Sequence, residues 1–282
     1  MFINHWHVAP EGTYDRAKPE MGSLAGMKKI MDQCGVEKGI AFAPFMHCMD
    51  YDYSWYRCPL KSERECNEWL YQSLKAYPGI YGFVTVNPLN PEVLDILTQY
   101  IHLGFAGVKM HPPIFRIKID DPKLDDFYST VAKLKVPILF HTGAHGGVLE
   151  TYLPILLDNV ANRHPELKII IEHCGLPCFF DQALGVLMSH SKARKRFNVF
   201  AGITGAVKAK YRDKVLQLVE EVGPDRMIFG LDYPFHGVED LTSQIDFMKN
   251  EIKLNPGEMD LVFGKNLEKI LNLEIQTKSG AL

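Results

Sequence analysis

Short apolar runs alternate with longer amphipathic segments along almost the whole chain. The runs that we expect to form strands cover residues 2–7, 39–43, 81–86, 106–110, 136–141, 168–173, 197–202 and 227–231. Short runs of this kind are typical of strands, and the run Ile169-Ile170-Ile171 is typical of a strand that is buried on both faces. The pattern therefore predicts eight strands that are separated by helices.

Capping residues mark the ends of several of the intervening helices. Ser23 is a predicted N-cap, and Gly35 lies where its helix should end. Asn90 and Asn255 each precede a proline, an order that is typical of an N-cap and the first helical position. The segment that Asn255 opens is expected to be an additional C-terminal helix.

Eight strand–helix units predict an α/β fold, a single (β/α)₈ TIM-type barrel with that additional C-terminal helix. No shift of composition marks a linker, so we expect one domain over residues 1–282. A doubly wound open sheet is the main alternative. It is disfavoured because no G-x-G-x-x-G turn follows any predicted strand.

Composition and charge argue against several classes of protein. A net charge of -3 gives no support for nucleic-acid binding, and no apolar run approaches the roughly 18 residues of a membrane helix. The N-terminus shows no signal-peptide pattern, and the six cysteines lack paired C-x-x-C spacing. We therefore expect a cytoplasmic protein with free thiols that acts on a small molecule.

Two histidines end the first predicted strand. Because side chains alternate along a strand, His5 and His7 should share one face while Trp6 takes the other. Two neutral imidazoles on one face form half of a transition-metal site. Considered alone, the pair is equally compatible with two half-buried structural histidines.

Polar residues also stand at the ends of later predicted strands. They are Lys109, His111, His141, His173 and Asp232. The C-terminal ends of barrel strands meet at one rim, and the last strand must close against the first. Asp232 should therefore approach the histidine pair, and three imidazoles with a carboxylate suit zinc or a similar divalent ion.

This ordered set of residues resembles the amidohydrolase superfamily. The matching motifs are His5-x-His7, His141 in Phe-His-Thr-Gly, His173 in Glu-His-Cys-Gly and Asp232 in Gly-Leu-Asp-Tyr-Pro. The closer resemblance is to the amidohydrolase-related group that includes aminocarboxymuconate-semialdehyde decarboxylase and pyrone-dicarboxylate lactonase. It covers nearly the whole chain and specifies the superfamily better than the substrate.

The resemblance implies roles for these residues. It implies that His5, His7, His141 and Asp232 bind the catalytic metal. It also implies that His173 is an acid/base residue in one-metal members and a ligand in two-metal members. One ion is favoured and two stay open. Zinc is the expected metal, although manganese, iron, cobalt and nickel accept the same nitrogen and oxygen ligands.

Lys109 has two readings. Some two-metal amidohydrolases carry a carboxylated lysine at the corresponding strand end, where it bridges both ions. The one-metal group carries a similar Gly-Val-Lys-x-His-Pro run in which the lysine is an ordinary amine. Alternation turns Lys109 and His111 to the same face, and the sequence leaves both readings open.

The expected activity is that of a hydrolase in which metal-activated water attacks a small carbonyl, amide or lactone substrate. Asp232 would accept the proton of the water, and His173 would orient it or stabilise negative charge. The alternative is a metal-dependent non-oxidative decarboxylase of a small unsaturated or aromatic acid. A second alternative is a non-catalytic barrel that retains a metal site.

Further residues are candidates for contact with substrate. They are His111, Trp55, Arg57 and Tyr233. The aromatic loop over residues 46–59 is either a lid over the site or a contact within a homodimer.

Other polar residues are expected outside the site. His47, His145 and His236 should be solvated on rim loops, and His102, His164 and His190 should lie on the surface near helix ends. Glu172 should face the helix layer.

Overall fold

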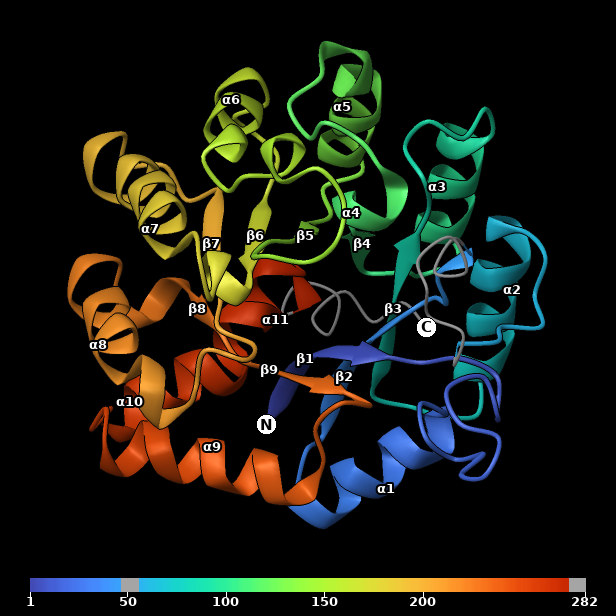
Figure 1. Cartoon of the computed structure of the whole chain (residues 1–282), viewed down its shortest axis with the longest axis horizontal. Coiled ribbons are helices and arrows are strands. Elements are labelled where there is room, and N and C mark those ends of the chain that lie inside the picture. The colour runs from blue at the N-terminus through green and yellow to red at the C-terminus, as the bar shows by residue number, and fades with distance from the viewer. Residues whose placement is uncertain (47–55, 274–282) are drawn as a thin grey trace.

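The strands form one parallel sheet that curls into a nearly closed barrel, seen in the computed structural model of Figure 1. The structure describes residues 1–46 and 56–273. Over these residues the strand order is β8-β7-β6-β5-β4-β3-β2-β1-β9. The strands are β1 (Phe2–His7), β2 (Lys38–Phe42), β3 (Ile80–Thr85), β4 (Gly107–Met110), β5 (Ile138–His141), β6 (Ile169–Glu172), β7 (Val199–Gly202), β8 (Met227–Ile228) and β9 (Gly230–Tyr233). The expected α/β barrel is confirmed.

The eighth predicted strand is split into two pieces. β8 pairs with β7, whereas β9 pairs with β1, and Phe229 alone separates the two pieces. The backbone N–H of Phe229 donates to Val262 O, outside the sheet, while its carbonyl accepts from Asn4 N. The barrel is therefore completed by one strand that shifts partners midway.

Helices surround the barrel (Figure 1). The longer ones are α1 (Leu24–Cys34), α2 (Glu63–Leu74), α3 (Val93–His102), α5 (Asp125–Lys133), α6 (Leu156–Arg163), α7 (Phe180–Met188), α8 (Arg212–Glu221) and α9 (Val238–Asn250). Shorter ones are α4 (Pro112–Phe115), α10 (Pro256–Asp260) and α11 (Asn266–Ile270). Across the described residues, no helix combines the length and apolar character that crossing a membrane requires.

The predicted caps are largely present. The Ser23 side chain accepts from Gly26 N, Gly35 adopts φ 65° after α1, and Asn255 forms a capping box. Asn90 is the exception, because it caps a turn by accepting from Glu92 N, and α3 begins only at Val93.

The barrel interior is a packed apolar core. One cluster joins side chains from strands all around the barrel with side chains of α11: Phe2, Ile40, Phe42, Phe83, Leu139, Ile170, Phe200, Ile228, Leu267, Ile270, Leu271 and Leu273. Such a cluster can form only inside the barrel. The segment expected to form one C-terminal helix from Asn255 is divided into α10 and α11. α11, red in Figure 1, closes the end at which the strands begin and leaves the opposite end for polar residues.

Candidate metal centre and active-site cavity

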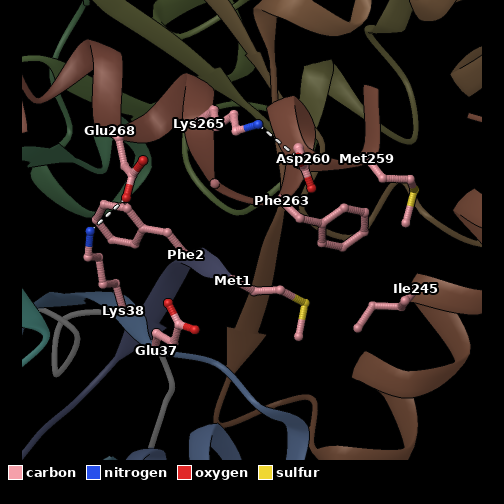
Figure 2. A pocket seen from close by; sticks show the side chains of 11 residues that line it. Met1, Phe2, Glu37, Lys38, Ile245, Met259, Asp260, Phe263, Lys265 and Glu268 are labelled. Carbon is pink, nitrogen blue, oxygen red and sulfur yellow. Dashed lines mark hydrogen bonds and ion pairs between the residues drawn. The ribbon is translucent and has the colours of Figure 1, made fainter. Parts of the chain in front are cut away.

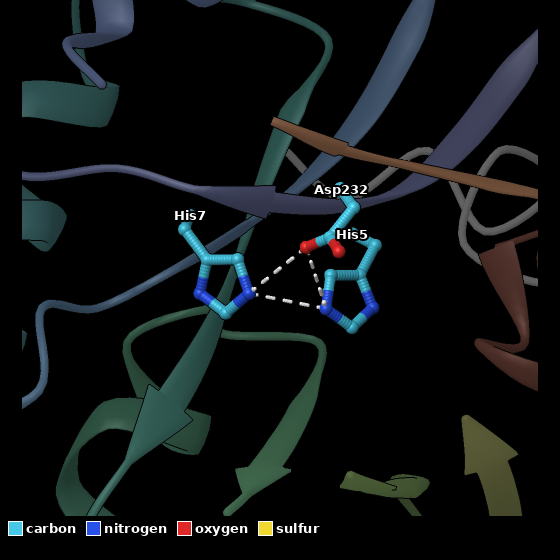
Figure 3. Close-up of side chains that lie close together, drawn as sticks. All are labelled: His5, His7 and Asp232. Atoms are coloured by element: carbon cyan, nitrogen blue, oxygen red, sulfur yellow. Dashed lines mark hydrogen bonds and ion pairs between the residues drawn. The ribbon is translucent and has the colours of Figure 1, made fainter. Parts of the chain in front are cut away.

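Three side chains from β1 and β9 meet at the C-terminal end of the barrel (Figure 3). His5 Nε2 lies 3.1 Å from His7 Nε2, and Asp232 Oδ1 lies 3.5 Å from each of these nitrogens. One nitrogen or oxygen atom of each residue lies within 4.8 Å of the others, a spacing that could hold a metal ion. The structure thus brings the polar residues of the first strand next to the polar residue of the last strand, as we expected from the order of the strands.

The backbone is unusual at this cluster. His5 and Asp232 adopt left-handed conformations, with φ 70° and φ 69°, and His173 does so with φ 65°. In residues other than glycine this conformation is uncommon and stores about 1–3 kcal/mol of strain. The pairing register of β1 shifts across His5 with respect to both neighbouring strands. This bulge allows the consecutive residues Asn4 and His5 to contact the same carboxylate, that of Glu172.

Lys109 lies on the inner face of β4, as alternation predicted. Its Nζ is 3.2 Å from His5 Nε2 and 4.6 Å from the centre of the Phe42 ring, and the side chain is fully buried. Burial lowers the pKa of Lys109 to about 8, although the nearby carboxylates of Glu172 and Asp232 oppose the shift. The amine can therefore exchange a proton near neutral pH.

Three further imidazoles extend the cluster toward β4, β5 and β6. The rings of His111 and His141 stack with centres 4.1 Å apart, and His173 lies 4.8 Å from His141 and 5.0 Å from His5. His141 Nε2 is buried and has no hydrogen-bond partner among the residues that the structure describes. His141 is nevertheless not part of the compact group formed by His5, His7 and Asp232.

His173 is held by its backbone-facing nitrogen. Its Nδ1 lies 2.9 Å from the carbonyl oxygen of Thr204, which can only accept, so Nδ1 carries the proton. The other ring nitrogen is then free of that bond, and His173 lines the cavity. It therefore has the carbonyl contact of a core histidine and also access to the site.

Burial shapes the protonation of the whole cluster. It is the main cause that lowers the pKa of His5, His7, His111 and His141, so these imidazoles are neutral at pH 7 and can offer a lone pair. Burial tends to raise the pKa of Asp232, but the adjacent histidines outweigh it and hold that pKa far below its usual range.

A cavity of about 310 Å³ opens above the cluster. Its polar wall contains His7, His111, His141, His145, His173 and Asp232, and its apolar wall contains Tyr14, Phe45, Tyr56, Ile114 and Phe235. The volume is near the small end of ligand pockets in proteins. The cavity therefore suits a compact substrate with a flat apolar part and a polar end.

The candidate substrate contacts have different positions. His111 lines the cavity, whereas Arg57 is exposed and does not line it. Tyr233 also differs from the expectation: its hydroxyl contacts Gly22 N, and its ring packs 5.6 Å from Trp6 on the outer side of β1. Tyr233 follows the left-handed Asp232 and points away from the cavity. Trp55 and His47 lie outside the described residues.

Several histidines differ from the sequence-based expectation. His145 lines the cavity, and its ring lies 4.8 Å from that of His111. Its position in a glycine-rich rim loop was the available signal. His190 is fully buried and lies 3.0 Å from Asp158, because the chain folds its helix end inward. His164 is half-buried against Asp125, and His236 lies beside Asp240.

Glu172 is the functional-site residue that the sequence analysis misplaced. It was expected in the helix layer because His173 was assigned to the inner face. β6 instead ends at Glu172, and His173 leaves the strand with φ 65°. Since Ile170 belongs to the interior core, alternation turns Glu172 inward as well.

Comparison with solved structures agrees with the barrel fold. A 2,6-dihydroxybenzoate decarboxylase from Rhizobium is 17% identical with a TM-score of 0.68, and the match covers 97% of this chain and 98% of that one. A probable 2-pyrone-4,6-dicarboxylic acid hydrolase from Acinetobacter baumannii is 14% identical with a TM-score of 0.66, over 96% and 98% of the chains.

A third similar structure was determined with a metal and an aromatic acid. This 5-carboxyvanillate decarboxylase from Novosphingobium aromaticivorans holds manganese and 4-hydroxy-3-methoxy-5-nitrobenzoic acid. It is 18% identical with a TM-score of 0.64, over 87% of this chain and 79% of that one. At such identities these likenesses establish the fold.

The family comparison rests on sequence. The pattern of the family described as amidohydrolase matches residues 50–273. This match takes in His141, His173 and Asp232 and spans most of the chain. The chain belongs to the amidohydrolase family.

Proposed function

We propose that this protein is a metal-dependent hydrolase that acts on a small carbonyl, amide or lactone substrate. The observation that carries the proposal is the convergence of His5, His7 and Asp232 beside a cavity that His7 and Asp232 line. Clusters of this composition at a barrel mouth are typical of metal-assisted hydrolysis.

The donor set fits a divalent cation. We propose that His5, His7, His141 and Asp232 hold it, because the histidines are neutral and the buried His141 Nε2 has no partner within residues 1–46 and 56–273. Zinc suits these donors best, and manganese, iron, cobalt and nickel share them. The manganese in the similar decarboxylase supports a divalent ion. When bound, such an ion lowers the pKa of water and polarises a carbonyl group.

The remaining chemistry belongs to the protein's own side chains. Asp232 is held as a carboxylate, so it can accept the proton of an attacking water and deliver it to the leaving group. The Nδ1–H group of His173 donates to Thr204 O. The other ring nitrogen is available to the cavity that His173 lines, where it can position that water. Lys109 acts as an amine in this scheme, since Nζ packs against the Phe42 ring.

The proposal is tested by turnover of a panel of lactones and amides with planar rings. Release of the free acid without carbon dioxide supports hydrolysis. A chelator should abolish this activity, and added zinc should restore it. The same panel given to Asp232→Asn must show no comparable turnover. Wild-type rates that persist in this variant contradict the assigned role of Asp232.

A second candidate is a non-oxidative decarboxylase of a small aromatic or unsaturated acid. The specific observation that favours it is the aromatic wall of the cavity, formed by Tyr14, Phe45, Tyr56 and Phe235, which suits a flat ring. Carbon dioxide released from hydroxybenzoates or muconate-like acids, with no turnover of lactones or amides, would select this reaction over hydrolysis.

A further inference from the structure

The Glu172 carboxylate joins three strands beneath the candidate metal centre. It is fully buried. Its Oε2 lies 3.0 Å from His5 Nδ1 and accepts from Asn4 Nδ2 at 2.7 Å. Its Oε1 accepts from the backbone N–H of His173 at 3.2 Å and of Thr204 at 3.3 Å. One side chain thus links β1, the end of β6 and the loop after β7.

The neighbouring strand leaves room for this carboxylate. A Cβ atom on Gly202 of β7 would lie 2.5 Å from Glu172 Oε1, closer than atoms of this kind approach. Gly202 has ordinary strand conformation, so its lack of a side chain is explained by this contact rather than by a turn. The local sequence is therefore compatible with a buried carboxylate at this position.

We propose that Glu172 is a positioning residue that fixes the ring of His5 as the Nδ1–H tautomer. An ionised carboxylate can only accept hydrogen bonds, so the nitrogen facing it must carry the proton. The Nε2 lone pair then points toward His7 and Asp232. Figure 3 shows one ring nitrogen of His5 facing these residues and the other facing away. The inference rests on the proposed function and adds a residue outside the ligand set.

The contact on the other side of the ring fits the same tautomer. Lys109 Nζ lies 3.2 Å from His5 Nε2, and when the lysine donates to this nitrogen, Nε2 is the acceptor. His5 Nδ1 has no hydrogen-bond partner besides this ion-pair contact in the described part of the chain. Glu172 below and Lys109 beside the ring therefore favour the tautomer that a metal ligand needs.

Glutamine cannot replace Glu172 in this role. In the described part of the chain the carboxylate accepts from the Asn4 amide and from two backbone N–H groups, and its Oε2 lies 3.0 Å from His5 Nδ1. A glutamine offers one oxygen and one NH₂ group, so it can satisfy one pair of donors and must oppose the other. Either the His5 ring changes its tautomer or the His173 and Thr204 backbone loses its acceptor.

The first test compares zinc affinity in Glu172→Gln and in the wild type, measured by competition with a chelating dye. We expect the variant to bind zinc about 10- to 100-fold more weakly, the usual effect of losing a partner of a metal-binding histidine. The matched control is Asn266→Ala at the opposite end of the barrel, which removes a part-buried hydrogen bond to Pro224 O and a buried one to Met227 O. It should lower stability and leave zinc affinity unchanged. Wild-type affinity in Glu172→Gln overturns the proposal.

The second test needs no substitution at Glu172 and no metal. Wild-type protein is labelled with ¹⁵N-histidine and stripped of metal, and the His5 signals are assigned by their loss in His5→Gln. We expect a protonated Nδ1 and an unprotonated Nε2 in the long-range ¹⁵N–¹H spectrum. A proton on Nε2 with a bare Nδ1 overturns the proposal. Failure of the wild type to bind any divalent ion refutes the proposed function instead, and the tautomer is still decided by the spectrum.

Discussion

The two ends of the barrel carry cavities of almost equal size but opposite character. The cavity at the strand starts, shown in Figure 2, measures about 300 Å³ and lies beside α11. Four of its five charged side chains form two ion pairs: Lys38 lies 2.6 Å from Glu268, and Lys265 lies 2.8 Å from Asp260. Most of its charges are thus offset by a neighbour of opposite sign.

The cavity at the strand ends, about 310 Å³, has a polar wall of imidazoles and one carboxylate instead. His111 Nδ1 and His141 Nε2 are buried there with no partner in the described part of the chain, and the backbone is left-handed at His5, His173 and Asp232. Buried polar atoms without partners and stored strain are both unfavourable for folding. The comparison teaches that chemistry and strain, rather than volume, distinguish the functional end.

The strongest way to break the comparison is to neutralise one carboxylate at each end. Asp232→Asn should lower kcat/KM by about 10²–10⁴-fold, since it removes the proton acceptor. Asp260→Asn, in the cavity beside α11, should leave kcat/KM unchanged because its partner Lys265 is exposed and far from the site. Steady-state kinetics on the substrate that the panel identifies measure both. Equal losses in the two variants would show that the ends are not distinct.

Removal of metal should affect only the cavity at the strand ends. Chelation should abolish turnover and lower the melting temperature. An ion whose free concentration is 100 times its Kd stabilises the native state by about 2.7 kcal/mol, and chelation removes this contribution. Calorimetry with and without zinc measures the shift, and Glu268→Gln at the other end should show the same shift as the wild type. A melting temperature that is insensitive to zinc argues against a metal bound to the folded protein.

The buried lysine gives the functional end a pH dependence in metal-free protein. The pKa of Lys109 is about 8 in the folded state against 10.5 for a free side chain, so the unfolded chain binds more protons between these values. The free energy of unfolding should therefore rise with pH from about 8 to 10.5, by up to about 3 kcal/mol.

Denaturant titrations across that range measure the slope, and Lys109→Met should remove it. Lys38, in the cavity beside α11, has a raised pKa because Glu268 accepts a hydrogen bond from it. Lys38→Met should therefore leave the rise between pH 8 and 10.5 intact. An unchanged slope in Lys109→Met would assign the titration to another group.

The sequence predicted the part of this architecture that follows from periodicity. Alternation and the order of strand ends placed His5, His7 and Asp232 together, because a barrel must close its last strand on its first. The same reasoning was wrong at the end of β6. The predicted strand includes His173, but β6 ends at Glu172, so the side chain of Glu172 points into the barrel rather than toward the helices. A left-handed conformation at His5 or Asp232 leaves no mark in the sequence, since nothing local distinguishes these residues from others of their type.

The smallest effect is expected from the ion pair beside α11. Lys38 and Glu268 are 35% and 27% exposed, so solvent screens their attraction, and Lys38→Met should change stability by about 1 kcal/mol or less. The removal of a charge from Glu172, which is fully buried, should destabilise the protein by a larger amount, because four donors lose part of their acceptor. Urea unfolding of Lys38→Met and Glu172→Gln compares the two ends directly. A larger loss of stability in Lys38→Met than in Glu172→Gln would show that the fold depends more on the cavity beside α11 than on the cavity at the strand ends.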